Sequence, residues 1–243
     1  MTVRARGAPV LYMTTEGVNS ITLKDVDYAY PGSRKKALQS VNFALNPGDF
    51  TVLTGVSGSG KTTLIRALRG EIVPTSGDLR ILGRHVKKKR NIKSLMLRRR
   101  IAVIYQDFKL IHNKTVFDNV AYPLEVSGYC PAAVRARAME SLHVLGLEGY
   151  ADKYPKDISG GEAQRVAIAR AIGMKPDVLL ADEPTGNLDV RSASKVFSVL
   201  QNLSCEGSAV LVSTHNTIFA RSVGGKTHVM EEGELFTTGE SLV

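Results

Sequence analysis

The sequence predicts an α/β fold that combines a mostly parallel sheet with an antiparallel β layer and a helical subdomain. Three apolar runs lack the alternation of half-exposed strands and are typical of parallel strands buried on both faces: Ile101–Tyr105, Asp177–Ala181 and Ala209–Thr214. Three β-rich runs separated by turn signals indicate the antiparallel layer: Ile21–Asp27, Val41–Leu45 and Asp78–Leu82.

Two helices are predicted between the first two apolar runs. The first begins at Pro131, ends at Gly146 and gathers its apolar residues on one face. The second follows Ser159 and Glu162, which have capping-box spacing, and ends at Gly173. These helices predict a helical subdomain over about residues 107–172.

Length and composition are those of a globular protein. At 243 residues the chain can form one large α/β domain, which we expect over residues 19–243 after a loose extension at 1–18. Either Met1 or Met13 could be the start. No apolar run reaches the ~20 residues that cross a bilayer, so we expect a soluble, cytoplasmic chain. Cys130 and Cys205 are expected to be free thiols, since their spacing suits neither a disulfide framework nor a zinc site.

The net charge of +9 comes from one segment. Arg84–Arg100 contains nine Lys and Arg residues and no acid, while the rest of the chain is balanced. Such a run could be a solvated connection, or it could meet an anionic membrane face or nucleic acid. The LMLRRR end of the run also has a structural character.

A glycine-rich segment predicts a phosphate-binding loop. It lies between an apolar run, Phe50–Thr54, and a predicted helix, Lys61–Leu68. The glycines allow backbone N–H groups to point at an anion on the positive end of the helix dipole. The segment fits G-x-x-x-x-G-K-[ST], which predicts a P-loop NTPase core in which the lysine reaches the phosphates and the next hydroxyl reaches Mg²⁺. The nucleotide-binding residues predicted here are Gly55, Ser57, Gly58, Ser59, Gly60, Lys61, Thr62 and Thr63.

Polar residues follow the predicted core strands. Asp182 and Glu183 end one apolar run, where the first could bind Mg²⁺ and the second could take a proton from the attacking water. Gln106 and His215 directly follow two others. Ligands of open α/β sheets bind at the carboxyl ends of the strands, so we expect all four to surround one phosphate site.

A second anion-binding helix start is predicted at Ile158–Glu162, with the sequence ISGGE. A capping box explains Ser159 and Glu162 without a ligand, but it does not require Gly160 and Gly161 between them. With this segment the sequence resembles the ATP-binding cassette ATPases, in whose signature Leu and Gln are commonest where Ile158 and Glu162 stand. The resemblance covers about residues 20–235 and includes every motif in order.

The resemblance implies the role of each motif. Tyr30 would stack on adenine, the P-loop would hold the phosphates, and Thr62, Gln106 and Asp182 would organise Mg²⁺. Glu183 would polarise water and His215 would contact the γ-phosphate. Two chains would form a homodimer on ATP, in which the Ser159–Glu162 segment closes over the partner's nucleotide. Asp189 would lie at the seam.

Within the family, Tyr105–Gly128 and Leu179–Asp189 look most like the ATPases of bacterial cell division. That branch implies a permease-like integral-membrane partner, control of peptidoglycan hydrolases and a peripheral location at the inner face of the cell membrane. ATPases of lipoprotein release and macrolide export share much of this pattern and remain alternatives. A cassette ATPase acting on nucleic acid is a further alternative, which the absence of an aromatic stacking surface disfavours.

The residues after Gln106 carry a prediction about the partner. We expect Phe108 and Leu110 to share one side of an extended segment and to line an apolar groove for a helix of the membrane partner. The alternative is that these side chains pack inside the helical subdomain.

Overall fold

A computed structural model describes residues 20–87, 99–215, 220 and 224–238 of the chain. Its larger sheet has six strands in the order β10-β9-β3-β8-β7-β6. The strands are β3 (Phe50–Thr54), β6 (Ile101–Ile104), β7 (Val178–Asp182), β8 (Ala209–Ser213), β9 (Lys226–Glu231) and β10 (Glu234–Thr238). All pair in parallel except β9 with β10. The mostly parallel sheet predicted from the apolar runs is therefore confirmed.

The smaller sheet is antiparallel and has the order β2-β1-β4-β5. Its strands are β1 (Ile21–Ala29), β2 (Lys36–Leu45), β4 (Ser76–Ile81) and β5 (Arg84–His85). This is the predicted antiparallel layer. The sequence did not lead us to expect β9 or β10, although β9 extends the parallel sheet beside β3.

Two apolar cores lie on opposite faces of the parallel sheet. Val178 and Leu180 of β7 join one core with β1, β2, β4 and α1 (Lys61–Leu68), so α1 lies between the two sheets. Leu179 and Ala181 of the same strand join the other core, with the helices of the opposite face. Successive strand residues point to opposite faces, so a strand covered on both sides must be apolar throughout.

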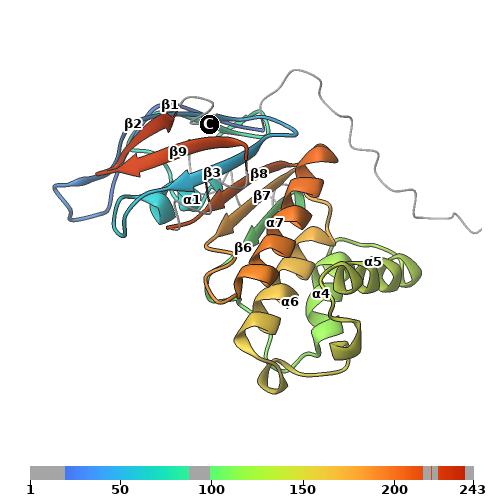
Figure 1. The fold of residues 1–243 in the computed structure, drawn as a ribbon. Helices are drawn as coiled ribbons and strands as arrows, with labels where there is room; N and C mark the ends of the chain where they lie inside the picture. The colour runs from blue at the N-terminus through green and yellow to red at the C-terminus, as the bar shows by residue number, and fades with distance from the viewer. Residues whose placement is uncertain (1–19, 88–98, 216–219, 221–223, 239–243) are drawn as a thin grey trace, which may run out of the picture.

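The helices on the second face are α4 (Val116–Val126), α5 (Pro131–Val144), α6 (Gly160–Ile172) and α7 (Val190–Cys205). Figure 1 shows α6 and α7 alongside the sheet and α4 and α5 further out. Two 3-10 turns, Glu148–Tyr150 and Pro155–Asp157, connect α5 to α6. No helix in the described ranges is long and apolar enough to cross a membrane.

The basic run is only partly described. Residues 88–98 and the N-terminal extension lie outside the described ranges. At the end of the run, an Arg99 Nη atom donates to the carbonyl of Val126 at 2.8 Å, and Arg100 Nε donates to Asp177 Oδ2 at 2.5 Å. These two arginines therefore connect β6 to α4 and to the start of β7, in agreement with the structural character expected of this end.

Candidate functional site

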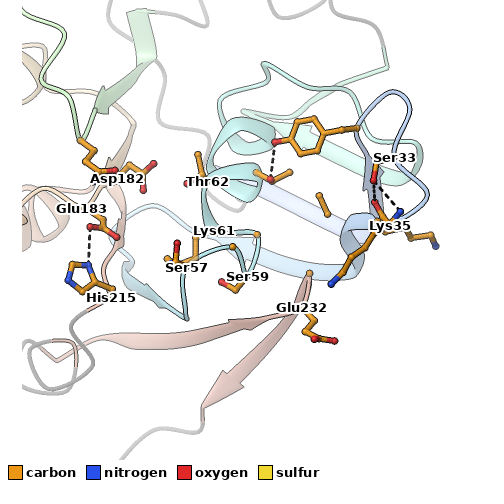
Figure 2. Close-up of a pocket in the computed structure, with 18 residues that line it drawn as sticks. Ser33, Lys35, Ser57, Ser59, Lys61, Thr62, Asp182, Glu183, His215 and Glu232 are labelled. Carbon is orange, nitrogen blue, oxygen red and sulfur yellow. Dashed lines mark hydrogen bonds and ion pairs between the residues drawn. The ribbon is translucent and has the colours of Figure 1, made fainter.

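A pocket of about 620 Å³ lies at the carboxyl ends of β3, β7 and β8. Figure 2 shows the loop residues Ser57, Ser59 and Lys61 between an acidic end and the turn after β1. The pocket brings together most of the predicted residues: Tyr30, Ser57, Gly58, Ser59, Gly60, Lys61, Thr62, Thr63, Gln106, Asp182, Glu183 and His215. The predicted phosphate site is therefore assembled in one place.

The glycine loop has the backbone that was predicted for it. Gly55 and Gly60 have φ of 146° and 115°, and an added Cβ would come 2.3 Å from the Met230 carbonyl oxygen and 2.8 Å from the Ala37 carbonyl oxygen. Any side chain there would be strained and would clash with backbone. The Lys61 ammonium donates to the carbonyls of Gly55 and Val56 at 2.7 and 2.9 Å, so it lies across the loop.

The acidic end of the pocket is built by β7 and β8. Ser213 Oγ donates to Asp182 Oδ1 at 2.6 Å, and the Glu183 N–H donates to Ser213 Oγ at 3.2 Å. Glu183 has φ of 48°, an uncommon conformation that turns its side chain out of the strand direction. Its Oε2 lies 3.0 Å from His215 Nδ1, and Figure 2 marks this contact with a dashed line. A carboxylate and an imidazole from neighbouring strands thus form one pair.

Tyr30 lies at the other end of the pocket, where β1 ends. Its hydroxyl lies 3.0 Å from Thr63 Oγ1 and accepts a hydrogen bond from Arg66 Nη1 at 3.2 Å. The ring of Tyr28 packs edge-on against it, with 5.1 Å between ring centroids. The ring is therefore held by its hydroxyl end and remains partly exposed.

Several lining residues were not predicted from the sequence. The turn after β1 supplies Ser33 and Lys35, the start of β2 supplies Lys36 and Ala37, and the β9–β10 turn supplies Glu232 and Gly233. The Gly233 N–H donates to the Ser59 carbonyl at 2.9 Å, which joins this turn to the loop. The paired lysines after Pro-Gly were an available signal in the first turn. The second turn belongs to the strands that were missed.

Lys36 also has a structural partner. Its ammonium donates to Asp27 Oδ2 at 2.7 Å, and this bond, followed by the Ser40 N–H and the Ser76 hydroxyl, lowers the pKa of Asp27 to about 2. The lysine is therefore fixed at the rim of the pocket by an acid that stays ionised.

The signature segment does not line this pocket. Ser159 caps α6, and its hydroxyl accepts from the Glu162 N–H at 3.3 Å while Glu162 Oε2 accepts from the Ser159 N–H at 2.7 Å. Hydrogen bonds with Tyr150 and then Ser159 lower the pKa of Glu162 to about 2. A Cβ added at Gly160 would meet nothing within 4 Å, and Gly160 has no positive φ. The fold of this chain does not itself require that glycine.

Asp189, the residue predicted at the dimer seam, caps α7. Its Oδ1 accepts from the Ser192 N–H at 2.9 Å, and bonding to the Ser192 hydroxyl and N–H lowers the pKa of Asp189. The segment just before it is close to the start of α6, since a Cβ on Gly161 would lie 3.4 Å from the Asn187 carbonyl oxygen. The segment after Glu183 therefore meets the signature inside one chain.

The residues predicted to hold Mg²⁺ are compatible with it. Thr62, Gln106 and Asp182 all line the pocket, and Asp182 Oδ2 is not the oxygen that Ser213 bonds. Mg²⁺ is usually held by one or two carboxylates together with substrate phosphates, and it keeps several waters. One carboxylate beside the phosphate loop agrees with this pattern, and the described residues contain no dedicated cluster of acidic or histidine ligands.

The groove predicted for Phe108 and Leu110 is wrong. Phe108 and Lys109 have φ of 59° and 49°, so the segment is a tight left-handed turn and is not extended. Leu110 is buried in the core of the helical region, and Phe108 is half-buried against the same core. Burial among Val116, Val120 and their neighbours recovers more apolar area than exposure in a groove would.

Comparisons with known proteins identify the family of this chain. The model of the ABC transporter family matches residues 38–186. The cell division ATP-binding protein FtsE of Mycobacterium tuberculosis is 45% identical over 196 residues, which are 81% of this chain and 85% of that protein. The methionine import ATP-binding protein MetN of Carboxydothermus hydrogenoformans is 37% identical over 221 residues, 90% of this chain and 66% of that protein.

A solved structure has the same fold. It is a dimeric post-hydrolysis state of the ATP-binding cassette MJ0796 bound to ADP and Pi, with a TM-score of 0.82 and 31% identity over 92% of this chain and 100% of that one. The family match covers more than half of this chain and includes the phosphate loop, Gln106, the signature segment and the adjacent acids Asp182 and Glu183. The chain therefore belongs to the ABC transporter family, as one of its ATPase cassettes.

Proposed function

We propose that this chain is the ATP-hydrolysing subunit of a cell-division complex of the FtsE type. It dimerises on ATP and drives a conformational change in an integral-membrane partner, an FtsX-like permease, that controls peptidoglycan hydrolysis. The subunit is cytoplasmic and peripheral on the inner face of the membrane. The 45% identity to an FtsE protein supports the branch, and the Glu183–His215 pair supports the chemistry.

Hydrolysis needs a base beside the γ-phosphate. Glu183 directly follows β7 and lines the pocket, and its Oε2 lies 3.0 Å from His215 Nδ1. Glu183 takes a proton from the attacking water while Lys61 and the loop N–H groups bind the phosphates. Tyr30 stacks on adenine, and His215 contacts the γ-phosphate. When bound, Mg²⁺ neutralises phosphate charge, held through Thr62, Gln106 and Asp182.

The second helix start serves the other subunit. Glycine in a helix destabilises it relative to alanine, yet packing within this chain gives no reason for Gly160. Bare N–H groups on a capped helix start, outside the chain's own pocket, are suited to the phosphates of a partner's nucleotide. Two chains therefore enclose two nucleotides, with Ser159, Gly160, Gly161 and Glu162 on the opposite side of each and Asp189 at the seam.

Replacing the base tests the chemistry. Glu183→Gln keeps the size and hydrogen-bonding shape of the side chain, so ATP binding should persist while turnover falls by about 10²–10⁴-fold. Phosphate release and nucleotide affinity measure the two separately. Glu140→Gln on α5, remote from the pocket, is the matched control and should retain activity. Normal turnover by Glu183→Gln would contradict the assignment.

Co-purification from membranes tests the branch. A single permease of cell-division type, recovered with the tagged chain, would support the proposal, and a transport permease would favour export, lipoprotein release or import instead. Nuclease-sensitive recovery would favour action on nucleic acid.

We further propose that the Arg84–Arg100 run contacts anionic lipid. Vesicle binding that is unchanged by salt, or by neutralising Lys87, Lys88 and Lys89, would contradict that contact.

A further inference from the structure

The turn that carries Gln106 is held in an unfavourable backbone conformation. The Phe108 N–H donates to the Tyr105 carbonyl at 3.2 Å, so Gln106 and Asp107 are the central residues of this turn. Phe108 and Lys109 then follow with φ of 59° and 49°. Two successive left-handed residues are rare, and a bulky aromatic in that region is a genuine outlier. Within the turn, the Lys109 N–H donates to the Asp107 carbonyl at 2.6 Å and the Lys109 ammonium pairs with Asp107 at 2.5 Å. Contacts from outside the turn add to this stabilisation.

Arg170 supplies that stabilisation from the last turn of α6. One Nη atom donates to the Phe108 carbonyl and the other to the Lys109 carbonyl, both at 2.7 Å. The planar guanidinium thus binds the two strained residues at once, which a lysine ammonium with its single nitrogen would do less well. Burial of the guanidinium lowers the pKa of Arg170.

The position of Arg170 on α6 links the Gln106 turn to the signature segment. The same helix begins at Ser159, the cap of the signature segment, eleven residues earlier. At 1.5 Å per residue these two points are about 16 Å apart along one rigid helix. One end of α6 therefore faces the predicted partner nucleotide, and the other end holds the turn that places Gln106 in the chain's own pocket.

We propose that Arg170 is a positioning residue that couples the α6 helix to Gln106, so that hydrolysis requires the signature helix to be in place. This inference rests on the proposed ATPase function. Without the guanidinium, the turn can relax to negative φ values and Gln106 leaves its place among the pocket residues. The phosphate loop and Tyr30 are untouched, so nucleotide binding is expected to continue.

The test compares Arg170→Lys and Arg170→Ala with the wild-type chain. We expect kcat to fall about 10- to 100-fold in Arg170→Ala, and less in Arg170→Lys, with KM for ATP unchanged within about twofold, because only a group near the reacting centre is misplaced. Arg137→Ala is the matched control. That arginine lies on α5, where its Cζ stands 4.6 Å from the centroid of the Tyr129 ring and an Nη atom donates to the Tyr129 hydroxyl at 3.3 Å. Its loss should leave kcat unchanged.

A second substitution distinguishes a positioning role of Arg170 from a general contribution to stability. Glycine adopts positive φ without strain. Adding Lys109→Gly to the Arg170→Lys variant should therefore raise kcat at least about threefold above that of Arg170→Lys alone. A purely structural role would give no rescue, since glycine adds flexibility to a weakened fold. Unchanged kcat in both Arg170 variants, or a failure of Lys109→Gly to restore any activity, would overturn the proposal.

Hydrogen exchange keeps the inference separate from the ATPase assignment. Arg170→Lys should accelerate exchange at the amides of residues 108–111, whether or not the chain hydrolyses ATP. If the wild-type chain lacked ATPase activity, the proposed function would be refuted. Faster exchange in Arg170→Lys would still support the stabilisation of the turn by Arg170. Unchanged exchange at these amides would refute the hold itself.

Discussion

The starts of α1 and α6 are both glycine-rich, yet they are built in opposite ways. The start of α1 has no side-chain cap, and Gly60 there has a φ of 115° with backbone 2.8 Å from an added Cβ. The start of α6 is capped by Ser159 and Glu162, and Gly160 has open space around it. The first glycine is required by the chain's own loop. The second is not required by the packing of this chain.

Changing Gly60 at the first start should strongly weaken nucleotide binding. Gly60→Ala forces an alanine into positive φ and into the Ala37 carbonyl. Strain of about 1–3 kcal/mol corresponds to a loss of roughly 5- to 150-fold in ATP affinity if the loop opens to relieve it. Fluorescent nucleotide titration measures the change. Wild-type affinity in a folded Gly60→Ala protein would show that the loop geometry is not needed for binding.

Mixing two defective chains tests whether the two helix starts contribute to the same nucleotide site. Lys61→Ala damages the phosphate loop and Ser159→Arg blocks the signature, so each homodimer should be inactive. In a mixed dimer both defects can fall in one composite site, which leaves the other site intact. We expect part of the activity to return on mixing, measured as phosphate release against mixing ratio. Full activity of dilute, monomeric wild-type chain would exclude shared sites.

Changing the second start should spare the fold and affect only turnover. Gly160→Ala adds a methyl group where nothing lies within 4 Å, so the free energy of unfolding should be unchanged or rise by up to about 1 kcal/mol. The same methyl would stand between the helix start and a partner's phosphate, so turnover should fall severalfold. Thermal melting and phosphate release together check this. A loss of stability would indicate that the glycine serves the chain's own packing.

The smallest expected effect concerns acid stability at the second start. The folded pKa of Glu162 is about 2, below the ~4.3 of an unfolded glutamate, so its contribution is present above pH ~4.3 and is lost as the pH falls toward 2. Glu162→Gln should weaken the cap, so the melting temperature at neutral pH should fall by a few degrees. The melting temperature should also depend less on pH between about 4.3 and 2. An unchanged profile would mean that the carboxylate adds nothing to the cap.

The sequence predictions succeeded where a feature depends on a local pattern, and they failed where it depends on contacts between distant residues. The continuous apolar runs identified β6, β7 and β8, because burial on both faces affects every residue of a strand. Strands β9 and β10 were missed, since their exposed faces give a weak pattern. Leu110 was misplaced because local sequence does not show that the chain turns left-handed at Phe108.

The sequence by itself determined the phosphate loop, the strand-end polar residues and the capped signature segment, because each depends on contacts within a few neighbouring residues. Only the tertiary structure decided which of these share one pocket and which face away from it. It also placed Glu232 beside the loop and Arg170 against the turn after Gln106. These contacts join residues 61 or more positions apart, and they form only when sheets and helices pack, so no local pattern encodes them.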